Sequence, residues 1–97
     1  MNQGEIRNFV DCMTYEDCTV RLGDKVFWCL GVTHDAETGV CHVGVWECEP
    51  DTFEFTENKL NFTGCSTEEC MQHFLEDKYW NGRSFHEVAP ELEWIDL

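Results

Sequence analysis

The clearest structural signal in this chain is KVFWCLGVTH (25–34), followed by the loop DAETG (35–39) and a second apolar segment, VCHVGVWECE (40–49). Apolar side chains recur at every second position in both segments, which is typical of β-strands. The loop between them is rich in residues that favour turns. The sequence therefore predicts an antiparallel β-hairpin.

The alternation also predicts which side chains share a face of this hairpin, because successive side chains of a strand point to opposite sides. On the first strand one face holds Val26, Trp28, Leu30 and Val32. On the second strand one face holds Val40, His42, Gly44, Trp46 and Cys48. We expect Trp28 and Trp46 to pack in the core. The candidates for exposed aromatic anchors of a protein interface are Tyr79, Trp80 and Trp94.

Shorter segments on both sides of the hairpin extend the predicted sheet. A strand at 18–22 precedes it, and the stretch at 6–12 is a first strand or an irregular lead-in. After the break at Pro50–Asp51, further strands are expected around 53–56 and 60–62, with a turn at Glu57–Asn58, and a last strand at 91–95. Neighbours in sequence usually pair in space, so we expect an antiparallel meander of about four to six strands.

One helix is predicted at about 66–80. Ser66 followed by Glu69 fits a capping box, and the acids of the first turn suit the helix dipole. An apolar stripe at helical spacing follows, and Asn81–Gly82 would end the helix. The predicted fold class is α+β, an antiparallel β-meander sheet with one α-helix packed on one face, and residues 1–97 are expected to form a single acidic domain.

The charge of the chain excludes several classes of partner. Six Lys and Arg face twenty Asp and Glu, giving a formal net charge of -14. This argues against direct binding of nucleic acid and of anionic membranes, both of which need basic surfaces.

The first residues lack the basic start and apolar run of a signal peptide, so we expect a cytoplasmic protein. In that compartment the seven cysteines are expected to be free thiols.

Metal binding and catalysis have little support in the sequence. The densest group of possible zinc ligands is Cys65, Cys70 and His73, but paired cysteines at Cys-x-x-Cys spacing are missing. Glycines are spread singly, so no phosphate-binding loop is predicted. No local signature marks a nucleophilic cysteine, although a Cys–His pair formed only in the fold stays open. We predict no cofactor and no catalytic residue, with a zinc-stabilised module as an alternative.

Clustered carboxylates are the remaining feature. The predicted partner-binding residues are Glu47, Glu49, Asp51, Glu54, Glu57, Glu91 and Glu93. Such an array suits a basic groove that normally holds phosphates, so the favoured function is a small acidic binding protein that occupies a nucleic-acid-binding surface of a partner protein. In composition the chain resembles small phage proteins that inhibit restriction or CRISPR nucleases, which would act in the host cytoplasm. The alternative is a generic accessory interaction domain, or a homodimer, that uses exposed aromatics.

Overall fold

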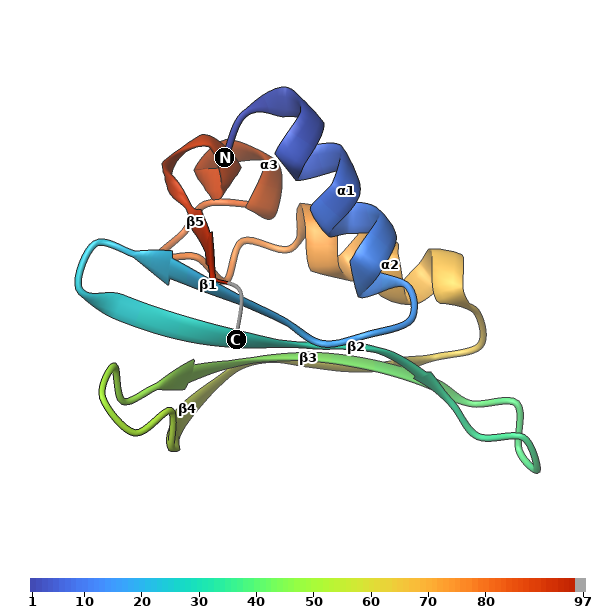
Figure 1. The fold of residues 1–97 in the computed structure, drawn as a ribbon. Helices are drawn as coiled ribbons and strands as arrows, with labels where there is room; N and C mark the ends of the chain where they lie inside the picture. The colour runs from blue at the N-terminus through green and yellow to red at the C-terminus, as the bar shows by residue number, and fades with distance from the viewer. Residues whose placement is uncertain (96–97) are drawn as a thin grey trace.

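Five antiparallel strands form one sheet in the computed structural model, which describes residues 1–95 (Figure 1). They are β1 (Cys18–Leu22), β2 (Lys25–His34), β3 (Cys41–Cys48), β4 (Phe55–Gly64) and β5 (Glu93–Ile95). Their order across the sheet is β4-β3-β2-β1-β5. The first four strands follow one another as a meander, and β5 returns to pair with β1. The predicted α+β class, the central hairpin and the returning last strand are confirmed.

The helices lie together on one side of the sheet (Figure 1). They are α1 (Gln3–Met13), α2 (Thr67–Glu76) and α3 (Phe85–Val88), and a 3-10 turn, η1 (Ala89–Glu91), follows α3. The prediction of a strand or irregular lead-in at 6–12 is wrong, because this stretch belongs to α1. Asn2 and Glu5 form a reciprocal capping box at its start, and Phe9 and Met13 bury its apolar face.

The helix predicted at 66–80 is shorter than expected. Ser66 caps α2 by accepting a hydrogen bond from the Glu69 N–H, as predicted, but the Glu69 carboxylate accepts from the N–H of Cys65. The helix ends at Glu76. Asn81 and Gly82 instead form a tight turn with positive φ angles of 54° and 82°, closed by a β-bridge that pairs Trp80 with Arg83. Asn–Gly therefore marks a turn here and not a helix end.

Bulges account for the other differences within the strands. The two short strands predicted around 53–56 and 60–62 form the single strand β4, which stays paired with β3 through two register shifts. In β2, Gly31 and Val32 lie between the pairs Leu30–Gly44 and Thr33–His42, so both oppose Val43. This bulge turns Val32 to the opposite face from Leu30, and Val32 packs in the core instead of sharing a face with Trp28.

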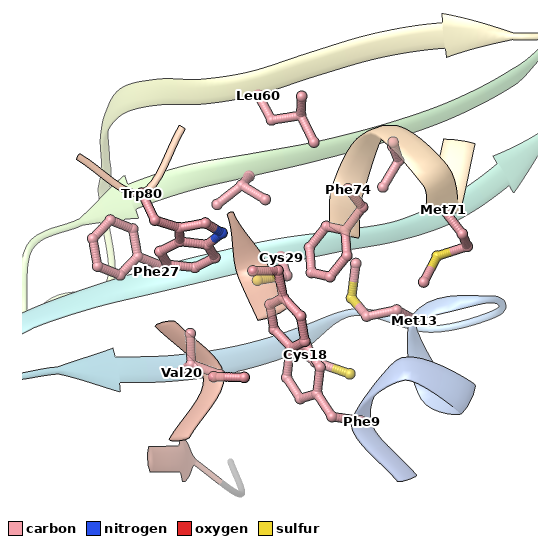
Figure 2. Close-up of a cluster of buried hydrophobic side chains, with 14 of the residues drawn as sticks. Phe9, Met13, Cys18, Val20, Phe27, Cys29, Leu60, Met71, Phe74 and Trp80 are labelled. Carbon is pink, nitrogen blue, oxygen red and sulfur yellow. The ribbon is translucent and has the colours of Figure 1, made fainter. Parts of the chain in front are cut away.

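The main core fills the space between the helices and the sheet (Figure 2). Phe9 of α1 stacks with Phe85 at a centroid distance of 5.4 Å, and Phe74 of α2 lies 5.0 Å from Phe85. The strands contribute alternate side chains to this cluster, among them Val20, Phe27, Cys29, Val43, Val45 and Leu60. The helices therefore cover one face of the sheet, and no helix of residues 1–95 lies on the other face.

Candidate functional site

Four of the predicted partner-binding carboxylates contact a basic side chain. Glu47 lies 3.7 Å from both Lys25 and Lys59, and Glu57 lies 3.2 Å from Lys59. At the other end of the strand order, Glu93 lies 3.8 Å from Arg21 and Glu91 is hydrogen-bonded to Arg83. The strand register supplies these partners, because it brings the start of β2 and the middle of β4 beside Glu47. These acids are partly neutralised, Glu57 by a lysine two residues away in sequence and Glu47 by lysines on two neighbouring strands.

Glu49, Asp51 and Glu54 lie in the turn between β3 and β4 and are exposed. Within residues 1–95 these three carboxylates make no ion pair, in contrast to Glu47 and Glu57 beside them. The turn is closed by hydrogen bonds between the backbones of Glu49, Phe53 and Glu54. The backbone of this turn is therefore fixed, and its exposed acids are available to a partner.

Aromatic side chains gather on the uncovered face of the sheet. Trp46 stacks on Phe55 at a centroid distance of 5.3 Å, and Trp28 lies 6.0 Å from Phe55. We call Trp28, Trp46 and Phe55 the aromatic strip. Phe55 is 47 % exposed, and the two tryptophans are half-buried. The prediction that Trp28 and Trp46 pack in the core is wrong, because they extend from the strand face opposite the helices.

The aromatic residues expected to be exposed are mostly buried. Trp80 is 3 % exposed and packs edge-on against Phe27 in the main core, so its prediction as an exposed anchor is wrong. The Tyr79 hydroxyl donates to the Phe74 carbonyl at 2.7 Å, and burial raises the pKa of this phenol well above its ordinary value. Trp94 is half-buried against Phe9, with ring centroids 5.2 Å apart.

A hollow of about 550 Å³ opens between α1, the loop at 14–17, β1 and the end of β5. We call it the acidic hollow, and its walls include Glu5, Glu16, Asp17, Thr19, Trp28 and Trp94. Among the lining residues of the described chain there is no Lys or Arg. Trp28 belongs both to this hollow and to the aromatic strip, so the two features are continuous. None of Glu5, Glu16 and Asp17 is among the residues predicted to bind a partner. The only sequence signal for Glu16 and Asp17 is that they form a pair of acids directly before β1.

Asp17 is held in place by two hydrogen bonds. Its Oδ2 accepts from the indole Nε1–H of Trp28 at 3.1 Å, and its Oδ1 accepts from the Gly31 N–H at 3.0 Å. Gly31 is required there, because a Cβ at this position would lie 2.2 Å from the backbone oxygen of Glu16. The bulge of β2 thus docks directly on the loop that carries the two acids.

The negative field of the hollow also acts on Cys18 in its wall. The pKa of the Cys18 thiol is raised to about 12, mainly by burial and in smaller part by nearby Cys12, Glu16 and Asp17. A thiol with such a pKa stays protonated at neutral pH, so Cys18 is not a nucleophile. The hollow is suited to holding a cation and not to thiol chemistry.

The possible zinc ligands do not come together. Cys70 is buried, Cys65 is exposed, and His73 stacks on Phe62 at 3.8 Å while its Nδ1 pairs with Asp77 at 2.9 Å. Within residues 1–95, His, Cys, Asp and Glu form no group of three or more that could hold a metal ion. All seven cysteines are free thiols, as expected.

A cysteine and a histidine that are separated in the sequence, Cys41 and His34, meet in the folded structure. His34 and Cys41 are paired across the end of the central hairpin, and the Cys41 Sγ lies 3.1 Å from His34 Nδ1. Thr67 contacts the other ring nitrogen of His34 at 3.1 Å. Cys41, His34 and Thr67 are thus arranged in the order of a nucleophile, a base and a group that orients the base. Cys41 is only 2 % exposed, however, so its sulfur is closed to a substrate, and the arrangement fastens α2 to the hairpin.

Comparisons with models of protein families, with curated proteins and with solved structures find no match for this chain. No helix within residues 1–95 is long and apolar enough to cross a membrane. The candidate site is therefore defined by geometry alone. It consists of the aromatic strip, the exposed acids of the β3–β4 turn and the acidic hollow.

Proposed function

We propose that this chain is a binding protein that docks on a basic surface of a partner protein through the uncovered face of its sheet. The observation that carries the proposal is the aromatic strip on that face, in a chain with a net charge of -14. Aromatic side chains surrounded by polar groups are the usual centre of a protein interface. Phe55 and Trp46 would supply the apolar contact, and Glu49, Asp51 and Glu54 the adjoining charge.

The charge favours a partner that handles nucleic acid. Carboxylates at the β3–β4 turn and around the hollow would be drawn to a surface that normally binds phosphates, and the encounter would be accelerated by long-range attraction. Nucleic acid would then be displaced from that surface, so the protein would act as an inhibitor without catalysis of its own. An inhibitor of a restriction or CRISPR nuclease, encoded by a phage and acting in the host cytoplasm, is one form that fits.

An affinity capture with a matched pair of variants tests the proposal. The protein is immobilised and incubated with lysate at about 0.1 M and about 1 M salt, over which the Debye length falls from roughly 10 Å to roughly 3 Å. The binding variant carries Glu49→Lys, Asp51→Lys and Glu54→Lys. The control carries Glu37→Lys, Glu68→Lys and Glu76→Lys, which change the net charge equally at exposed positions away from the β3–β4 turn.

We expect the unchanged protein and the control to retain the same nucleic-acid-binding protein at low salt. The binding variant should not retain this partner. Double-stranded DNA added to the unchanged protein should release the bound partner. Equal retention by the two variants would mean that net charge and not the β3–β4 turn holds the partner. Retention that survives high salt and all reversals would contradict the basic-partner proposal and favour an interaction domain based on the aromatics alone.

A homodimer is the second candidate, favoured by one specific observation. β4 is an edge strand of ten residues, and β3 is its only strand neighbour within the described chain. Edge strands can pair with a second copy. Two copies would, however, bring together twice the negative charge, so this dimer should form only when salt screens the repulsion. Sedimentation of the pure protein at both salt concentrations separates the candidates.

A further inference from the structure

We infer that the acidic hollow is the subsite that receives an arginine side chain of the basic partner. This inference rests on the proposed function and names the group that the partner inserts. The hollow lies beside the aromatic strip and shares Trp28 with it, so a partner seated on the uncovered face is adjacent to the hollow. Its volume of about 550 Å³ accommodates an arginine side chain together with part of the flanking backbone.

The charge of the walls selects a cation. Glu5, Glu16 and Asp17 all line the hollow, and no base of the described chain lines it with them. Asp17 is fixed by its bonds from Trp28 and Gly31, each of which uses one oxygen and leaves further lone pairs free. A carboxylate that is already oriented loses less entropy when it binds, and guanidinium is the cation whose planar fork matches it.

The remaining walls favour guanidinium over ammonium. Trp28 and Trp94 present indole rings, on which a guanidinium stacks better than a compact, strongly hydrated ammonium does. Thr19 also lines the hollow, and this residue is 4 % exposed. Its hydroxyl takes part in none of the hydrogen bonds within residues 1–95, and solvent reaches the oxygen, because it is not among the sealed polar atoms that lack a partner. A guanidinium N–H in the hollow would donate to this oxygen in place of water.

The test uses two short peptides of equal length, one of arginine and one of lysine, added to the full chain. Binding is measured by calorimetry, and the indole N–H signals of Trp28 and Trp94 are followed by NMR. The variants are Glu16→Gln, which removes a wall charge, and Thr19→Val, which removes the hydroxyl and keeps the shape. Neither side chain has a hydrogen-bonded partner within residues 1–95. The matched control, Glu37→Gln, removes one charge from the distant β2–β3 loop.

We expect the arginine peptide to bind more tightly than the lysine peptide and to shift both indole signals. Its dissociation constant should rise about ten-fold in Glu16→Gln and about five-fold in Thr19→Val, and stay within about two-fold in the control. If both peptides bind equally and only the Glu49, Asp51 and Glu54 reversals weaken them, the arginine subsite is wrong and the proposed function stands. If neither peptide binds at low salt, both are wrong.

Discussion

The two faces of the sheet are built from the same strands and differ in what covers them. The helix-covered face carries small and medium apolar residues such as Val43, Val45 and Cys29, which are fully buried. The uncovered face carries the largest side chains of the same strands, Trp28 and Trp46, which remain half-exposed. Both faces carry aromatic rings, because Phe27 of β2 packs on the covered side. Coverage by the helices, and not the presence of apolar or aromatic residues, distinguishes the two faces.

This difference separates stability from binding. Side chains on the covered face contact the helices and should control the free energy of unfolding. Those on the uncovered face contact mainly one another, so their removal should affect a partner more than the fold. Each of the following experiments tests that separation, beginning with the largest expected change.

The largest loss is expected for Phe74→Ala on the covered side. Phe74 is fully buried and packs against Phe85 and Phe9, so its removal leaves a cavity in the main core. The free energy of unfolding should fall by about 3–5 kcal/mol. Urea denaturation followed by circular dichroism measures this change. A loss below about 1 kcal/mol would mean that the covered face is not the dominant core.

A smaller loss is expected at Gly31, where the β2 bulge joins the two faces. The added methyl of Gly31→Ala would overlap the Glu16 backbone, and we expect a cost of about 1–3 kcal/mol as the loop at 14–17 moves away. Gly4→Ala is the control, because its Cβ would have room and alanine favours the helix. Urea denaturation should show opposite signs for the two variants. Equal stability of Gly31→Ala and the unchanged protein would contradict the close docking of this loop.

The buried thiol of Cys18 should make stability fall in alkaline solution. Its pKa is about 12 in the folded protein, against roughly 8.5 in an unfolded chain, so the folded state holds the proton more tightly. The contribution of this thiol to the free energy of unfolding is complete below pH ~8.5. It is lost as the pH rises toward ~12, by up to about 1.4 kcal/mol per pH unit. Urea midpoints between those pH values measure the slope. Cys18→Ala should be less stable, and its free energy of unfolding should depend less on pH. An unchanged slope in this variant would contradict the raised pKa of Cys18.

The smallest effect on stability is expected for Trp46→Ala on the uncovered face. The variant loses a half-buried ring and its stacking on Phe55, so the free energy of unfolding should fall by only about 1 kcal/mol. Binding to the captured partner should fall at least ten-fold, because interface aromatics contribute most of the affinity. Denaturation and calorimetry on the same sample give both values. A loss of stability as large as that of Phe74→Ala would abolish the distinction between the faces.

Much of the fold could be predicted from the sequence, because alternation, turn residues and a capping box are local signals. The hairpin, the meander, α2 and the returning strand follow from them. α1 was missed although Asn2 and Glu5 carry the same capping pattern as Ser66 and Glu69. The identity of the covered face could not be predicted, because both faces of β2 and β3 are apolar and the strand pattern contains no information about where the helices pack.

The candidate site was less accessible to sequence reasoning. Glu47 has no base near it along the chain, yet the strand register places Lys25 and Lys59 beside it. The acidic hollow depends on Asp17 meeting the bulge at Gly31, and this contact is specified only when β1, β2 and the preceding loop are assembled. Charge counted along the chain therefore could not separate the acids that are paired in the fold from those of the β3–β4 turn, which are not.

The pairing of β5 with β1 has a consequence for the order in which the sheet forms. The contacts among β1, β2, β3 and β4 join neighbours in sequence and close short loops, whereas the pair of Thr19 with Ile95 joins residues far apart along the chain. Loop-closure entropy makes such a distant contact the slowest to form. β1 should therefore keep an open edge until β5 docks. The acidic hollow, which lies at this edge, would be completed only in the last step of folding.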